Sequence, residues 1–169
     1  MSHLFYDLSI APMLRMLRNL DAIVTKAEAF VASDEGIEPA TLIQARLHPN
    51  MRPLVFQIRV VTDTAKGAAA RLTGREIPSW ADDEVTFADL HQRLAKAIDY
   101  LSGFKPEDFD GAEGRTIEMK LGPQTVKFDG ASYVSGFALP NFFFHVTTAY
   151  NILRHNGVEL GKMDFLGKP

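Results

Sequence analysis

The sequence feature that most constrains the fold is a run of 24 residues without a formal charge, from Gly130 to Leu153. A helix that is apolar on nearly every side must be buried on nearly every side, in a membrane, a bundle core or a subunit interface. A membrane span would place Pro140, Asn141 and His145 near the middle of the bilayer, where polar groups need partners. We therefore predict a buried helix of a water-soluble protein, and we expect it to be the most buried element of the chain.

Composition limits the classes of partner and of chemistry. The chain has 169 residues and a net charge of −3, and its 18 Lys and Arg residues are scattered, so a nucleic-acid partner is not expected. The lack of cysteine excludes disulfides, thiolate metal ligands and a cysteine nucleophile, and it fits a reducing compartment. The first residues lack the basic start and apolar core of a secretion signal. We expect a cytoplasmic protein without a membrane partner, in which residues 1–169 form a single helical-bundle domain.

Hydrophobic periodicity predicts four long helices. In the first, apolar residues from Ile10 to Val31 recur at helical spacing, which is typical of a core-facing helix. Ser9 can cap this helix, Pro12 then falls in its first turn, and Gly36 marks its end. The other long helices are expected over 53–72, 86–102 and 132–155, the last with a kink or restart at Pro140.

A change of period before the last helix predicts a β-hairpin. Apolar and polar residues alternate over 117–121 and again over 126–128, and Gly122-Pro123 marks the turn between them. Two strands alone are marginally stable, so the hairpin must pack on the helices. Residues 38–47 predict a shorter helix and 75–85 predict a surface loop. The fold class expected is therefore all-α, a four-helix bundle with a small inserted β-hairpin.

The five histidines are the first candidates for a site, because metal chemistry without cysteine depends on histidine together with Asp, Glu or Tyr. His3 and His91 are expected in solvent, and His155 suits the last turn of a helix because a cation there favours the dipole. His48 precedes the second long helix and could approach one end of the bundle. His145, among phenylalanines, is either a core histidine held by a hydrogen bond or part of a site.

Polar residues among apolar neighbours give few further candidates. Gln57 and Asp63 are expected to face solvent, although either could turn inward toward His145. The run Gly67–Ala70 predicts close helix packing. No Gly-rich phosphate loop, HExxH motif or nucleophile elbow occurs, so common catalytic signatures are missing from the sequence. A cluster of acidic residues is expected to be solvated surface: Glu107, Asp108 and Asp110.

Four segments spread along the chain carry a resemblance to a known family. They are PNMRPLVFQ, DTAKGAAARL, FALPNFFFHVTTAYNILRHNG and LGKMDFLG. Together they resemble the domain of unknown function 1993 family, over essentially the whole chain. That family is grouped with the DinB/YfiT-like bundles, many of which bind a divalent ion through three histidines, and some of which are thiol-dependent transferases or isomerases. The resemblance implies a DinB/YfiT-like four-helix bundle and assigns no reaction.

The resemblance also implies a metal pattern that this chain matches only in part. The superfamily has one histidine on the second long helix and an HxxxH pair on the last. His145 matches the first member of the pair, but Ala149 stands at the second, and the second long helix contains no histidine. A divalent metal held by His145 would need His48, Asp63 or Gln57 as substitute ligands, in a geometry that differs from the superfamily's. A complete three-histidine site is not expected.

Two functions from different classes stay open at this point. One is a small-molecule transferase or hydrolase, with or without a divalent metal, with a pocket near His145, which acts as metal ligand or general base. The other is a non-catalytic, homodimeric ligand-binding or structural bundle. A homodimer is predicted because a helix this apolar has surface left after its bundle neighbours have covered it. Whether His145 lines a water-accessible pocket or a closed core distinguishes the two.

Overall fold

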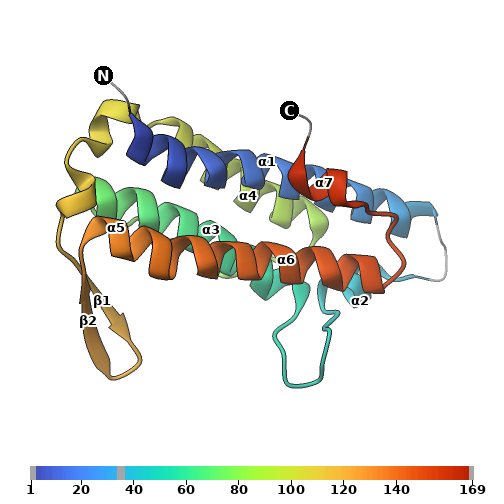
Figure 1. Ribbon diagram of the computed structural model, residues 1–169. Coiled ribbons are helices and arrows are strands. Elements are labelled where there is room, and N and C mark those ends of the chain that lie inside the picture. The colour runs from blue at the N-terminus through green and yellow to red at the C-terminus, as the bar shows by residue number, and fades with distance from the viewer. Residues whose placement is uncertain (1–2, 34–36, 168–169) are drawn as a thin grey trace.

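Four long helices form most of the structure, a computed structural model that describes residues 3–33 and 37–167, apart from the side chain of Leu121 (Figure 1). The expected fold class is confirmed: the chain is an all-α four-helix bundle with a small β-hairpin. The long helices are α1 (Leu4–Ser33), α3 (Leu54–Thr73), α4 (Phe87–Ser102) and a last helix made of α5 (Gly130–Tyr133), the π-helical turn η3 (Val134–Ala138) and α6 (Leu139–His155). Two short helices are α2 (Pro39–Ile43) and α7 (Lys162–Leu166).

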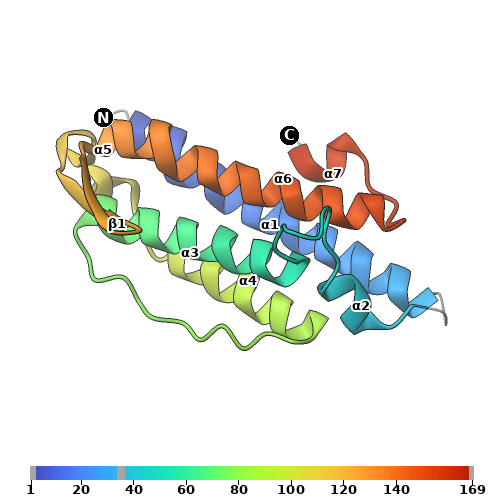
Figure 2. The same ribbon diagram turned by 90° about the horizontal axis from the view of Figure 1, so that it is seen from below.

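The long helices run in two parallel pairs. α1 and α6 point in one direction, and α3 and α4 point together in the other (Figures 1 and 2). The connection between α3 and α4 is therefore a long loop that returns along the outside of both helices (Figure 2), as expected for residues 75–85. One end of the bundle gathers the starts of α1 and α5 with the hairpin, and α2 lies at the opposite end.

Local sequence signals explain where most helices begin and end. Thr86 caps α4 in a capping box with Asp89, whose amide donates to Thr86 Oγ1 at 3.2 Å. α3 ends at Gly74, which has φ of 71°, a backbone conformation that favours glycine. Asp129 caps α5 by accepting a hydrogen bond from the Ser132 amide at 2.7 Å. In the last helix, the π-helical turn ends two residues before Pro140, and the helix continues past the proline without a break.

The first helix begins earlier than predicted. It starts at Leu4, so Ser9 and Pro12 both lie inside it, and the assignment of Ser9 as its cap is wrong. Ser9 Oγ instead donates to the Phe5 carbonyl at 2.5 Å. Hydrophobic periodicity did not predict the first turns of α1, because Leu4 and Leu8 are exposed and do not belong to the core-facing stripe. Gly36, the predicted end marker, lies outside the described residues.

The central helix is α3, which contacts α1, α4 and α6. Fourteen of its 20 residues are buried, against six of the 17 in α6, so the expectation that the last helix is the most buried element is wrong. A span without charges can still be polar, and within this span α6 exposes Thr147 and Asn151. The close packing predicted for Gly67–Ala70 is confirmed, because all four residues are buried.

The segment between α4 and the last helix closes one end of the bundle. Two 3₁₀ turns, η1 (Pro106–Phe109) and η2 (Ala112–Gly114), place Phe109 and Ala112 in the core. The predicted hairpin follows as β1 (Ile117–Leu121) and β2 (Gln124–Phe128), an antiparallel pair in which Ile117 lies opposite Phe128. Ile117 is buried at the base of the hairpin, and the far end projects from the bundle (Figure 1).

The short helix α7, which periodicity did not predict, fastens the end of the described chain to α1. Asp164 forms an ion pair with Lys26 at 2.7 Å. Asn19 Nδ2 donates a hydrogen bond to the Phe165 carbonyl at 2.9 Å. At five residues α7 is too short to show a helical stripe. Over 3–33 and 37–167, none of the helices is long and apolar enough to cross a membrane.

We predict that the stability of the fold requires glycine at position 130, where α5 meets η2. A Cβ at this position would lie 1.8 Å from the Ala112 carbonyl oxygen, so Gly130→Ala must displace one backbone segment. We expect the free energy of unfolding to fall by about 1 to 3 kcal/mol, measured by urea denaturation. Gly136→Ala is the matched control, because beyond its own turn of helix no heavy atom lies within 4 Å of its Cβ position. An unchanged midpoint for Gly130→Ala would contradict the close approach.

Candidate functional site

His145 on α6 faces the first turns of α3. Its Nδ1 lies 2.7 Å from Oε1 of Gln57, and Nε2 of Gln57 donates to the Arg52 carbonyl at 2.9 Å. Because the amide nitrogen of Gln57 is bound to a carbonyl, the amide oxygen is the atom turned toward the imidazole. The hydrogen-bond network therefore assigns the proton of the neutral ring to Nδ1 and leaves the lone pair on Nε2.

The imidazole of His145 is half-buried and does not lie in a closed core, while the hydrogen bond expected of a core histidine is present. Its ring makes edge contacts with Phe144 and Phe56, at centroid distances of 5.1 and 6.2 Å. This burial lowers the pKa of His145 below its usual value, because apolar surroundings disfavour the imidazolium cation. No group of the described residues hydrogen-bonds to Nε2, which is open to solvent. The site thus presents a neutral imidazole with an accessible lone pair.

Gln57 turns inward to His145, which is the alternative that the sequence left open. It is 2% exposed, which corrects the expectation that it faces solvent. Its neighbours Leu54, Ile58 and Val61 are all buried, and this proximity to the apolar stripe is the signal that favours the inward orientation. A buried amide needs partners for its oxygen and its nitrogen. His145 and the Arg52 carbonyl supply both.

The other predicted metal ligands have partners of their own. Asp63 accepts from Lys66 at 2.7 Å and from Arg93 at 3.0 Å. His48 is exposed in the loop before α3, with Nδ1 at 2.6 Å from Asn50 Oδ1. Among the described residues, no three or more His, Cys, Asp or Glu side chains are grouped so that they could hold one metal ion.

The residues around His145 therefore do not fit the three-ligand metal site that the family resemblance implies. Ala149, one turn further along α6, is fully buried and has no donor atom. Gln57 Oε1 already accepts the hydrogen bond from Nδ1. Of these three side chains, only His145 offers a free donor atom to an ion, and that atom is Nε2.

A buried ionic cluster joins α3, α4 and the loop between them. Arg93 donates to Glu84 at 2.6 Å and to Thr62 at 2.8 Å, and Arg59 donates to the other carboxylate oxygen of Glu84 at 2.6 Å. Burial raises the pKa of Glu84, but the hydrogen bonds from Arg93 and Arg59 more than offset this, so the pKa lies below its usual value. Because its charges are paired, we interpret this cluster as structural: it holds the loop between α3 and α4 against these two helices.

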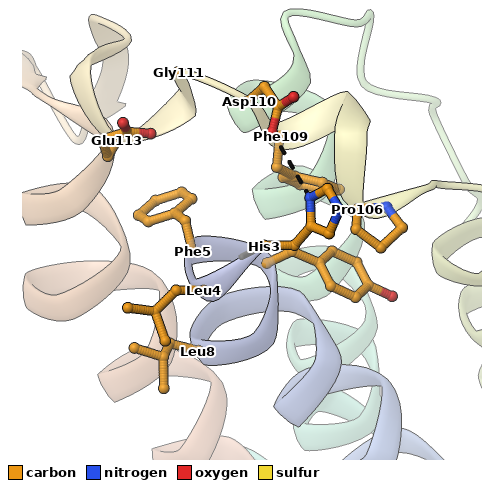
Figure 3. A pocket seen from close by; sticks show the side chains of 10 residues that line it. His3, Leu4, Phe5, Leu8, Pro106, Phe109, Asp110, Gly111 and Glu113 are labelled. Atoms are coloured by element: carbon orange, nitrogen blue, oxygen red, sulfur yellow. Dashed lines mark ion pairs between the residues drawn. The ribbon is translucent and has the colours of Figure 1, made fainter. Parts of the chain in front are cut away.

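Two histidines expected in solvent have carboxylate neighbours. Nδ1 of His91 lies 2.6 Å from Asp21 on α1. His3 lies between Glu107 and Asp110, which follow it by about a hundred residues, at the wall of a pocket (Figure 3). Sequence spacing could not reveal these pairs, because they depend on how α1 packs against other elements. Four pockets stand out on the described surface, and His145 lines none of these four.

Comparison with known proteins agrees with this architecture. The family model described as Domain of unknown function (DUF1993) matches residues 5–166. The chain belongs to this family. A crystal structure of a DinB family member protein from Shewanella denitrificans is similar to this DUF1993 chain, with a TM-score of 0.88 and 40% sequence identity over 98% of this chain and 93% of that chain. The DinB-like fold is thereby confirmed. No curated protein gives a significant match.

In this DUF1993 chain, the environment of His145 predicts a pH-dependent stability. Its folded pKa is lowered below the ordinary value of 6.5, so the unfolded chain binds the proton more tightly. The contribution of His145 to stability is thus fully present above pH 6.5 and falls as the pH drops from there toward the folded pKa. His145→Asn should remove this part of the pH dependence in urea unfolding experiments.

The substitution is chosen because asparagine can still donate to Gln57 but does not titrate. His48→Asn changes an exposed histidine in the loop before α3 and serves as the control, which should keep the wild-type slope. The same slope in His145→Asn as in the wild type would show that His145 does not titrate differently in the folded state.

Proposed function

We propose that the chain is a small-molecule transferase or hydrolase in which His145 acts as a general base. The observation that carries the proposal is the hydrogen-bonded series from the Arg52 carbonyl through Gln57 to Nδ1 of His145, which leaves Nε2 open to solvent. A general base must be unprotonated near pH 7 and must direct its lone pair at the reactant. The lowered pKa and the fixed tautomer of His145 supply both conditions.

In the proposed step, Nε2 takes the proton of a hydroxyl, a thiol or a water molecule while that nucleophile forms a bond to an electrophilic carbon of the substrate. The imidazolium then returns the proton to the leaving group as the old bond breaks. Gln57 Oε1 accepts the hydrogen bond from Nδ1 in both states, so it orients the ring throughout. Phe144, which is 59% exposed, offers an apolar surface for the substrate beside the imidazole.

A second candidate is the non-catalytic bundle, in which the bond between His145 and Gln57 only joins α6 to α3. Two observations favour it: Gln57 is almost fully buried, and the four pockets lie away from His145. Such a protein would bind a ligand elsewhere or serve an assembly. The two candidates differ in whether Nε2 takes part in chemistry.

The catalytic role predicts a large and selective effect of His145→Ala. In a screen of esters, epoxides and thiol acceptors, turnover should fall by about 10²- to 10⁴-fold, the usual contribution of a general base. Gln57→Leu should reduce turnover less, because the ring is retained but its tautomer is no longer fixed. His155→Ala should leave turnover unchanged.

A direct probe of Nε2 does not require the substrate. Diethyl pyrocarbonate acylates unprotonated imidazole nitrogens, so mass spectrometry should find His145 modified at neutral pH. An unreactive His145 together with full turnover in His145→Ala would overturn the general base and favour the structural bundle. Stoichiometric divalent metal in the purified protein that is lost in His145→Ala would replace the general base by a metal ligand.

We also propose that the chain forms a homodimer in the cytoplasm, the compartment that fits its lack of cysteine. The exposed Phe144 on α6 supports a dimer, because a large apolar side chain on a helix surface is a candidate contact with a second copy. A partner over this corner would also enclose the space around Nε2 and exclude water from it.

Sedimentation tests the homodimer by mass. The wild type should sediment at twice the chain mass of 18.8 kDa at micromolar concentration. Phe144→Glu should shift it to the monomer, while Val85→Glu, at another exposed apolar position, should not. A wild-type monomer under these conditions would rule out the dimer.

A further inference from the structure

A pocket separate from the His145 corner lies at the end of the bundle where α1 begins (Figure 3). Its volume is about 370 Å³, which is within the range of small-molecule sites. The first residues of α1 form one wall, and the segment that contains η1 and η2 forms the other. Two stretches of chain separated by about a hundred residues therefore build this pocket.

The walls of the pocket are mainly apolar and aromatic. Leu4 and Phe5 line it from α1, and Phe109 lines it from η1. Phe109 is 2% exposed and contacts the Tyr6 ring at a centroid distance of 5.3 Å, so this side of the pocket is anchored in the core. Such walls suit an apolar group of a ligand.

The charged side chains of the pocket lining are acidic. Asp110 and Glu113 line the pocket, and Glu107 lies beside it next to His3. Lysine and arginine do not occur among the described residues that line it. A pocket lined by charge of one sign attracts ligands of the opposite sign, so this one favours a cation.

His3 adds an unsatisfied polar atom to the pocket. Its Nε2 lies 3.5 Å from Glu107 Oε1, so a neutral ring that carries its proton on Nε2 directs that proton at the carboxylate. Nδ1 then presents a lone pair 3.8 Å from Asp110 Oδ1, and this buried nitrogen has no hydrogen-bond partner. None of the described residues donates to Asp110, whose exposed carboxylate meets solvent, so a donor placed between the two atoms would serve the buried Nδ1 and the carboxylate together.

We propose that this pocket binds a small protonated primary amine with an apolar group. The ammonium donates one hydrogen bond to Nδ1 of His3 and one to Asp110, and Glu113 adds a second negative charge. An ammonium has three donors and no acceptor, which matches a pair of facing acceptors. The apolar group packs against Phe5 and Phe109, whose ring faces also attract cations. This site does not depend on the role of His145.

A competing arrangement would remove the need for a donor. If His3 carries protons on both nitrogens, the imidazolium itself faces Glu107 and Asp110, and the two carboxylates neutralise it. An amine then gains no new hydrogen bond at this position. The two arrangements give opposite results in a binding experiment.

The experiment titrates the full chain at pH 7 with 2-phenylethylamine, which is protonated there. Its controls are 2-phenylethanol, which has the same apolar group without the charge, and 3-phenylpropionate, which reverses the charge. Calorimetry gives the affinity and NMR shifts locate the ligand. The amine should bind beside η1 and η2, the alcohol at least tenfold more weakly, and the carboxylate without detectable affinity.

Three variants test the residues named. Asp110→Asn and His3→Phe should each weaken the amine at least tenfold, because each removes one of the two facing acceptors. Glu38→Gln removes an exposed carboxylate beside α2, at the opposite end of the bundle, and should change nothing. The side chain of Asp110 is 66% exposed, so its variant should keep the wild-type melting temperature.

Three results would overturn the proposal. Equal affinity for the amine and the alcohol would show that the pocket does not recognise the charge. A similar loss in Glu38→Gln would show that the amine responds only to the net charge of the protein. No binding of the amine at millimolar concentration would favour the imidazolium arrangement of His3.

Discussion

The burial of α3 against α1, α4 and α6 is the constraint on which the rest of the structure depends. Small side chains at Ala65, Ala68 and Ala69 allow the neighbouring helices to approach, and each of these residues is fully buried. A helix so enclosed has no wide face to offer to water, so its polar side chains must find partners inside the bundle. The resulting hydrogen bonds connect α3 to α6 and α4: Gln57 to His145, Thr62 to Arg93, and Thr64 to Asn141. Lys66 pairs with Asp63 within α3 itself.

Local patterns were sufficient to predict the fold class, because each of them acts over a few residues. The capping box at Thr86, the glycine at Gly74 and the turn at Gly122 all fix the backbone without help from the rest of the chain. The relative burial of the helices was not predictable in this way. A charged residue such as Lys66 is expected at the surface, but its exposed fraction is only 6%. Its ammonium lies 4.3 Å from the centre of the Trp80 ring and pairs with Asp63.

Only part of the candidate site could be predicted from the sequence. The phenylalanines around His145 indicated an apolar environment, and Ala149 indicated a gap in the metal pattern of the superfamily. The decisive partner, Gln57, lies 88 residues away and is brought to His145 by the packing of α3 on α6. The same holds for His3 and Asp110, which meet because α1 begins at the end of the bundle that η1 covers.

The pairing of α1 with α6 also has a consequence for folding during synthesis. These are the first and the last of the long helices, and they lie in contact, with α7 fastened across α1. During synthesis the ribosome releases α1, α3 and α4 before the residues that complete their core. Contacts between distant parts of a chain form slowly, since the intervening chain must first lose its freedom. The nascent bundle therefore keeps apolar surface open until its last long helix emerges, longer than a bundle whose core is complete after its first helices.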